Sequence, residues 1–195
     1  GVTQTAAAIA DAFGGSDPTS VLLLFLNNTE LRPGGGFLGT YGLAEFSGGA
    51  LTQFTTDDVY ALDRTVVGTL TREPPAPFRD HGIVRYRYLR DANWSPDFAE
   101  SSRPVLDFYT EEGGAGNPEV VVGFTPNLAA ALLTITGPVT VSGVRFDAEN
   151  IADELEYQVE QAYFTRGIPQ PQRKDIIAPL STAVIDRLYE IPLRD

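Results

Sequence analysis

Arginine and carboxylate side chains at two places in this chain could together bind a phosphate group. Arg32 lies in the glycine-rich segment Glu30-Leu31-Arg32-Pro33-Gly34-Gly35-Gly36-Phe37, and Arg90-Asp91 opens a polar block that runs to Phe98. Guanidinium groups and the backbone N–H groups of glycine-rich turns both bind anions. The first segment therefore has two interpretations, a hairpin connection or an anion-binding loop in which Glu30 and Arg32 contact the ligand.

Asp57-Asp58 directly follows a predicted strand, and ligands of open α/β sheets bind at strand ends. Carboxylates in that position could hold Mg²⁺ together with a substrate phosphate, with Asp91 as a second metal ligand, or Asp58 and Asp91 could position the nearby arginines. The alternative is a turn or a helix cap. Another acidic pair, Glu111-Glu112, is expected on a solvated helix end.

Arg85, Arg87 and Arg90 form the densest basic cluster of the sequence. They could contact an anionic ligand, or they could lie on a charged edge strand that has Arg85 and Arg87 on one face. Trp94, the only tryptophan, follows this cluster. With Tyr86 and Tyr88 it could form an aromatic platform for a glycan or a protein partner.

Composition excludes several classes of site. The chain has no cysteine and one histidine, so thiolate chemistry, zinc ribbons and multi-histidine metal sites are absent. No Gly-x-Ser-x-Gly elbow or Walker phosphate loop occurs. A net charge of −12 argues against general nucleic-acid binding and against wide contact with anionic lipid headgroups.

The elements that must position these residues follow from hydrophobic periodicity and turn signals. Val21 to Leu26 lacks polar alternation, as expected for a strand buried on both faces. Further strands are predicted over residues 37–46, 51–56, 119–124 and 139–141, with helices over residues 3–13, 101–112, 125–136, 147–159 and 174–189. This order predicts an α/β fold, a three-layer α/β/α sandwich with a central mixed sheet.

The 195 residues suit a single domain, with a lead-in over residues 1–19 and a core over residues 20–190. No segment approaches the roughly 20 apolar residues that span a bilayer. Because the chain begins at Gly1 and lacks methionine, we expect it to be a piece of a longer protein, with any membrane contact made through a segment outside this sequence.

Three segments resemble a known family. They are Asn27 to Phe37, Arg90-Asp91-Ala92-Asn93-Trp94-Ser95-Pro96-Asp97-Phe98, and Leu133 to Val139. Together they are similar to domain-of-unknown-function family 4012, over nearly the whole chain. The resemblance implies an extracytoplasmic domain of a bacterial, membrane-anchored protein located at the cell envelope.

A weaker likeness is to the LytR–CpsA–Psr phosphotransferases, which move glycopolymers from polyprenyl diphosphate carriers onto the cell wall. Three places in the sequence carry this likeness. They are Leu31-Arg32-Pro33-Gly34 before a strand, Asp58 after a hairpin, and Gln172-Arg173-Lys174 before the last helix. The arginine beside Asp58 and the aspartate after Arg32 that the family has are missing here. The resemblance implies Arg32, Arg90, Arg173 and Lys174 as contacts for anionic oxygens.

Two functions follow as expectations. The first is a domain that binds a glycan- or phosphate-bearing cell-wall ligand, or an envelope protein, without catalysis. The alternative is an active phosphotransferase that uses a polyprenyl diphosphate carrier, with Asp58, Arg32 and Arg90 as catalytic residues and Mg²⁺ as its cofactor. Phosphoryl transfer needs mainly positioning and charge stabilisation from the protein, so either outcome suits these residues.

Overall fold

A four-stranded mixed sheet forms the centre of the molecule, in the strand order β3-β2-β1-β4. The computed structural model describes residues 17–191, and the helix predicted over residues 3–13 lies outside them. Antiparallel pairing joins β1 to β2 and β2 to β3, whereas β4 runs parallel to β1. The strands are β1 (Thr19–Asn27), β2 (Phe37–Ser47), β3 (Ala50–Asp58) and β4 (Val120–Phe124). The predicted mixed α/β class is confirmed.

A two-residue turn joins β2 to β3, as the sequence predicts. Gly48 and Gly49 have φ values of 57° and 79°, and this left-handed pair matches the twist of a tight hairpin. The short strand predicted over Val139–Val141 also forms. It pairs only with the next strand, so β5 (Val139–Val141) and β6 (Val144–Phe146) make a separate hairpin outside the main sheet.

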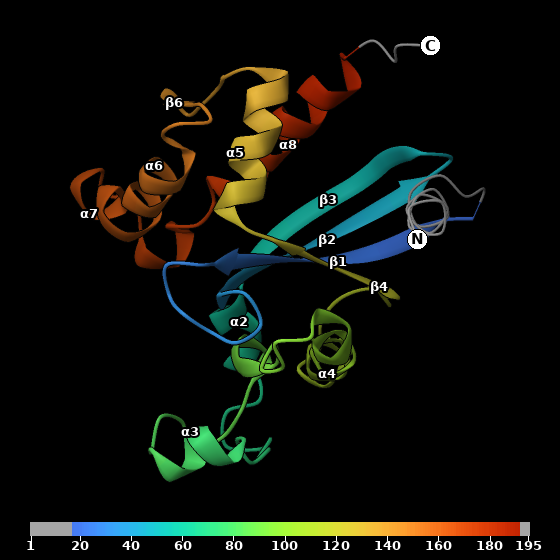
Figure 1. Cartoon of the computed structure of the whole chain (residues 1–195), viewed down its shortest axis with the longest axis vertical. Helices are drawn as coiled ribbons and strands as arrows, with labels where there is room; N and C mark the ends of the chain where they lie inside the picture. The colour runs from blue at the N-terminus through green and yellow to red at the C-terminus, as the bar shows by residue number, and fades with distance from the viewer. Residues whose placement is uncertain (1–16, 192–195) are drawn as a thin grey trace.

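Helices lie on both faces of the sheet (Figure 1). On one face are α2 (Val59–Asp63), α3 (Ala76–Asp80) and α4 (Phe98–Glu111), together with the 3₁₀ turn η1 (Leu89–Asp91). On the other are α5 (Pro126–Thr136), α6 (Ile151–Tyr157), the π-helical η2 (Gln158–Ala162), α7 (Tyr163–Thr165), the 3₁₀ turn η3 (Gln170–Gln172) and α8 (Ile177–Tyr189). Within residues 17–191, no helix is both long and apolar enough to cross a membrane.

Helix α4 begins earlier than expected. The sequence predicts this helix from residue 101, but Asp97 caps it by accepting hydrogen bonds from the N–H groups of Ala99 and Glu100. A carboxylate at this position also interacts favourably with the helix dipole. The earlier start places Phe98 on the helix, beside the backbone of Gly123 in β4.

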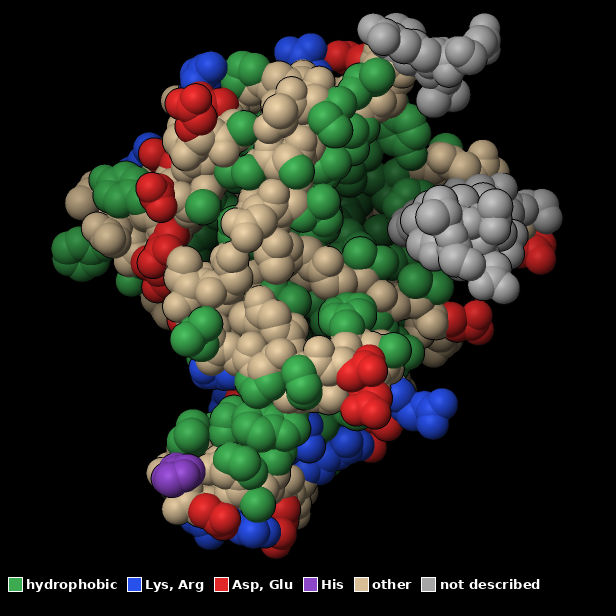
Figure 2. Space-filling view, viewed as in Figure 1, with side chains coloured by type: hydrophobic (Ala, Val, Ile, Leu, Met, Phe, Trp, Pro, Cys, Tyr) green, Lys and Arg blue, Asp and Glu red, His purple; other side chains and the backbone are tan. Residues whose placement is uncertain are grey.

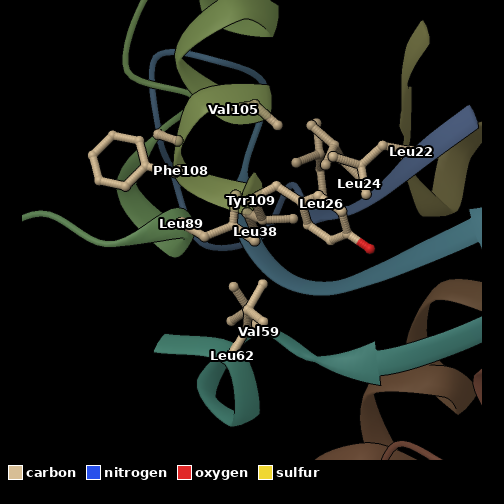
Figure 3. Packing of buried hydrophobic residues seen from close by; sticks show 11 residues of the cluster. Leu22, Leu24, Leu26, Leu38, Val59, Leu62, Leu89, Val105, Phe108 and Tyr109 are labelled. Carbon is tan, nitrogen blue, oxygen red and sulfur yellow. The ribbon is translucent and has the colours of Figure 1, made fainter. Parts of the chain in front are cut away.

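The first face of the sheet is filled by a continuous hydrophobic core (Figure 3). Leu22, Leu24 and Leu26 of β1 point into it and face Val105 of α4, and Phe108 of α4 belongs to the same cluster. Leu22, Leu24, Val105 and Phe108 have no exposed surface, and Leu26 is nearly as buried. This core fixes α2, η1 and α4 against the sheet.

A second core holds the helices of the other face together. Residues of α5, α6, α8 and the β5–β6 hairpin make it up, among them Leu133, Phe146, Ile151 and Leu180. It includes no residue of the four-stranded sheet, so these helices pack chiefly on one another.

Residues 64–88 form a protruding lobe around α3, at the bottom of Figure 1. The predicted edge strand that would carry Arg85 and Arg87 does not form. This segment has one isolated bridge, between Arg72 and Arg87. The prolines of this segment limit regular pairing, since proline has no N–H to donate to a strand ladder.

Candidate functional site

A largely apolar pocket of about 500 Å³ lies between the sheet and α5, α6 and α8. Its floor includes the rings of Phe25, Phe54 and Phe124, from three different strands. Gly42 on β2 makes room for two of them, because a Cβ there would lie 3.2 Å from the rings of both Phe25 and Phe54. Figure 2 shows a recess lined by hydrophobic side chains beside α5.

The pocket explains why β1 is apolar on both faces. Leu22 and Leu24 fill the first core, whereas Leu23 and Phe25 line the pocket and remain partly accessible. The sequence predicts burial on both faces, and this holds for one face only. The hydrophobic residues of the second face border open space instead of packed side chains.

Both ends of α8 are tied to the sheet across this space. Before the helix begins, the Lys174 ammonium donates to the Gly39 carbonyl at 2.5 Å and forms an ion pair with Asp58 at 3.0 Å. Near its end, the Tyr189 hydroxyl accepts from the Leu51 N–H at 3.3 Å. Because these contacts hold the helix at its ends, the middle of α8 can line the pocket without closing it.

Lys174 lines the pocket where β1 and β3 end, and we call the region around it and its ion-pair partner Asp58 the mouth. Burial lowers the pKa of Lys174, and the carboxylate of Asp58 acts against that shift. Asp58 also caps α2 by accepting the Tyr60 N–H at 3.0 Å. The cap interpretation of Asp58 is therefore confirmed, and the same carboxylate holds a lysine at the mouth.

Aromatic rings connect the predicted cations at this mouth. The guanidinium of Arg32 lies 5.2 Å from the Phe37 ring centre, and the Phe37 and Tyr60 rings are 6.3 Å apart. Tyr60 in turn lies 5.2 Å from the Arg90 guanidinium and 5.7 Å from the Lys174 ammonium. The fold thus brings Arg32, Arg90 and Lys174 around the rings of Phe37 and Tyr60. Neither ring was predicted as a site residue from the sequence.

Arg32 is the cation at the mouth that has no acidic partner. Within residues 17–191, no carboxylate lies within ion-pair distance of its guanidinium, which donates to the Leu31 carbonyl at 3.0 Å. Its buried Nε has no hydrogen-bond partner. Glu30 lines the pocket beside it. Arg32 is therefore the charge most available to an incoming anion.

Arg173 lines the pocket on the side of α6. It forms an ion pair with Glu160 at 2.6 Å, and Glu160 belongs to the π-helical turn η2. Such turns are rare and often occur at functional sites. Here the π-helical turn contributes Val159 and Glu160 to the pocket wall.

Two of the three sequence segments that carry the family resemblance pack against each other. The Asn93 amide donates to the Gly36 carbonyl at 2.9 Å, and a Cβ on Gly34 would collide with the Asn93 backbone. Gly36 has a φ of 140°, and a Cβ there would collide with Asn27. Close packing therefore requires these glycines, and they hold Arg32 in a fixed turn.

Arg90 belongs to a buried acidic cluster behind the mouth. Its guanidinium pairs with Asp63 at 2.5 Å and with Asp91 at 3.7 Å. Burial raises the pKa of Asp91, and the charge of Arg90 partly offsets this effect. Asp63 is fully buried, and sequence reasoning missed it because an acid inside a helix usually signals a solvated face.

The prediction that Glu112 lies on a solvated helix end is wrong. Glu112 is 2% exposed and accepts the Leu89 N–H at 2.7 Å, whereas the neighbouring Glu111 is accessible and pairs with Arg72. Burial, reinforced by the nearby charge of Asp63, raises the pKa of Glu112 to about 8. The raised pKa favours the protonated form of Glu112, which can share its proton with Asp63 through the hydrogen bond between the two side chains.

Three predicted ligand contacts lie away from the pocket. Arg85 stacks on Tyr86 in the lobe, Arg87 lies 5.3 Å from the Phe108 ring, and Trp94 packs on Phe78 with ring centres 4.5 Å apart. Tyr88 is buried, so the proposed Trp94–Tyr86–Tyr88 platform is not an open surface.

Mg²⁺ does not fit the arrangement of Asp58 and Asp91 described here. A cation already pairs with each of them, and the described chain contains no group of three or more His, Cys, Asp or Glu side chains suited to a metal. The metal role of these two residues, and the catalytic roles of Asp58, Arg32 and Arg90, stay predictions.

Comparison with known proteins agrees with the resemblance seen in the sequence. The family model described as "Protein of unknown function (DUF4012)" matches residues 16–159. No curated protein matches the sequence. The matched span contains the whole sheet, the Arg32 turn and the Arg90 block, whereas Arg173, Lys174 and α8 follow it. The chain belongs to the DUF4012 family.

Proposed function

We propose that this domain binds an amphipathic ligand of the cell envelope, with an apolar chain in the pocket and a phosphate at the polar mouth. The observation that carries the proposal is an apolar pocket of about 500 Å³ with Arg32, Arg173 and Lys174 at or near one end. Ligand pockets are commonly of this size and combine apolar walls with a few polar groups that orient the ligand.

The position of the mouth supports a phosphate at that end. Asn27 ends β1 and Thr125 follows β4, and both residues line the pocket. Carboxyl ends of parallel strands are the usual ligand-binding edge of an α/β sheet. The far end is lined by Val184 and Leu188 of α8 and suits a hydrocarbon.

This arrangement also suits the expected extracytoplasmic location and a LytR–CpsA–Psr-like α/β/α fold. Polyprenyl-phosphate carriers of cell-wall glycopolymers combine an apolar chain with an anionic head, as the pocket requires. We favour binding over catalysis because Asp58 is already engaged by Lys174 and by the α2 backbone.

Farnesyl phosphate is a short, soluble probe for this proposal. Isothermal titration should show binding to the wild-type domain and much weaker binding of farnesol, which lacks the phosphate. Arg32→Ala should weaken binding about ten- to a hundredfold, since a hydrogen bond to a charged group contributes about 1.5–3 kcal/mol. Arg85→Ala is the matched control, because Arg85 lies in the lobe.

A second pair of variants tests the apolar part. Ala129→Phe places a ring in the pocket, whereas the neighbouring Leu128→Phe changes an exposed position that does not line it. The first substitution should abolish farnesyl phosphate binding and the second should leave it unchanged. No detectable binding by the wild type, or equal binding by Ala129→Phe, would overturn the proposal.

The transferase alternative predicts more than binding. It requires Asp58 to exchange Lys174 for Mg²⁺ and requires Mg²⁺-dependent release of phosphate from a diphosphate carrier. Comparing farnesyl diphosphate turnover by the wild type and by Asp58→Asn, with and without Mg²⁺, separates the two functions. Turnover lost in Asp58→Asn would favour the transferase, and binding without turnover favours the proposal above.

A further inference from the structure

Three connections each expose a large hydrophobic side chain to solvent. Leu31 is 87% exposed in the connection 28–36, Ile83 is 56% exposed in the lobe 64–88, and Phe164 is 82% exposed in the connection 163–176. Val67 adds a further exposed residue to the lobe, at 61%. Solvent exposure of this degree is costly for Phe and Leu, because each leaves much of its apolar area in water.

These connections lie on the same side of the molecule. Figure 1 shows the loop after β1, helix α3 of the lobe and helix α7 all on the side to which the β1 arrow points. The mouth of the pocket is on this side too, since Asn27 at the end of β1 lines it. In Figure 2, hydrophobic side chains protrude over α7 and gather on the lobe.

Charge is strongly segregated toward the same connections. Together they hold 9 of the 14 Lys and Arg residues but only 4 of the 26 Asp and Glu residues, a net charge of +5. Carboxylates of other elements pair with Arg72, Arg173 and Lys174, so the connections with these three partners carry a net charge of +2. Outside the three connections the sequence carries a net charge of −17, against −12 for the whole chain. This asymmetry would turn the three connections toward any anionic surface and turn the rest of the domain away from it.

We propose that these three connections dock the domain on an anionic lipid bilayer, with Leu31, Ile83 and Phe164 inserted at the interface. Isolated apolar tips flanked by arginines suit the boundary between headgroups and hydrocarbon, where apolar burial and attraction to anionic lipids act together. Arg32 and Arg166 flank two of the tips, and Arg79 and Arg85 are exposed beside the third.

A bilayer fits this surface better than a protein partner. Protein interfaces are centred on one contiguous, closely packed patch. Here the tips are on three separate connections. Contact is therefore limited to the tips, and binding should be weak and sensitive to salt.

Docking is separable from ligand binding in the pocket, so the two proposals can fail independently. Vesicles of phosphatidylcholine alone, and of phosphatidylcholine mixed with phosphatidylglycerol, are the probes, without farnesyl phosphate. The wild-type domain should sediment with the anionic vesicles at low ionic strength and remain in the supernatant with neutral vesicles or at high ionic strength.

Matched substitutions test the tips and the charges. Ile83→Glu and Phe164→Glu should each reduce sedimentation several-fold, whereas Ile135→Glu should not, although Ile135 is 66% exposed on α5. Arg85→Ala and Arg166→Ala should each weaken vesicle binding about fivefold, as expected for one basic residue near an anionic surface. The control is Arg103→Ala on α4, outside the three connections. Thermal melts of all variants check that the domain remains folded.

Three results would overturn the proposal. The first is no sedimentation with anionic vesicles at low ionic strength. The second is an equal loss in Ile135→Glu or Arg103→Ala. The third is binding to an acidic polypeptide such as polyglutamate, with the same sensitivity to Arg85→Ala and Arg166→Ala and no binding to vesicles, which would make this side a protein-binding surface.

Discussion

The two faces of the sheet have the same kind of hydrophobic residues, but other side chains pack closely against only one of them. On one face, Leu22 and Leu24 are fully buried against α4. On the other, Leu23 and Phe25 of the same strand line an open pocket. The helices over the pocket have a core of their own and are tied to the sheet at the two ends of α8. One face therefore stabilises the fold, and the other is available to a ligand.

Truncating adjacent leucines of β1 should give the largest contrast. Leu24→Ala should lower the free energy of unfolding by about 2–5 kcal/mol, because it leaves a cavity in a packed core. Leu23→Ala should cost only about 1 kcal/mol, since its side chain already borders open space and loses fewer contacts. Urea unfolding of both variants measures the difference. Equal losses would mean that the two faces are packed alike.

The buried acid on the filled face should make stability depend on pH. The pKa of Glu112 is raised to about 8 in the folded domain. Above the usual pKa of an unfolded glutamate, about 4.3, the unfolded chain therefore binds fewer protons than the folded one. Stability is fully present below that value and is lost as the pH rises toward 8.

Glu112→Gln isolates this effect. A glutamine amide can still accept from the Leu89 N–H and donate to Asp63, but it does not titrate. Urea unfolding between pH 5 and pH 8.5 should therefore give a flatter stability profile for the variant than for the wild type. A wild-type profile that rises over this interval would contradict the shared proton.

Removing the tie between α8 and the sheet should have an intermediate effect. Lys174→Met leaves the Asp58 carboxylate and the Gly39 carbonyl without their partner and should cost about 1–3 kcal/mol. Arg187→Met, on the exposed side of the same helix, should change stability by less than about 0.5 kcal/mol, as surface ion pairs usually do. Chemical unfolding again supplies the measurement, and similar values for the two variants would exclude Lys174 as a tie.

Filling the hollow face should produce the smallest change, with the opposite sign. Ser181 lies on α8 and lines the pocket. Ser181→Ile replaces a hydroxyl with apolar atoms there and should raise the free energy of unfolding by about 1 kcal/mol. Farnesyl phosphate binding should fall at the same time. A loss of stability would indicate that the pocket has no room for the added atoms.

Most of the local structure between residues 17 and 191 could be predicted from short sequence patterns. The apolar run of β1, the Gly48-Gly49 turn and the proline at the start of α5 specify their elements through backbone geometry and periodicity, which act over a few residues. Arg32 and Asp58 could be predicted as candidate site residues from the sequence. An arginine in a glycine-rich turn and a carboxylate after a strand are both local signals.

Contacts between residues far apart in the sequence depend on how whole elements pack, and local patterns do not predict them. Asp63 and Glu112 are separated by 49 positions, yet packing buries them together and raises the pKa of both. Lys174 reaches Gly39 across 135 residues. The pocket depends on how far α8 is held from the sheet, and hydrophobic periodicity is the same for a packed face as for a hollow one. A pattern of apolar residues therefore predicts burial, and the arrangement of whole elements decides whether side chains or a ligand will fill the space.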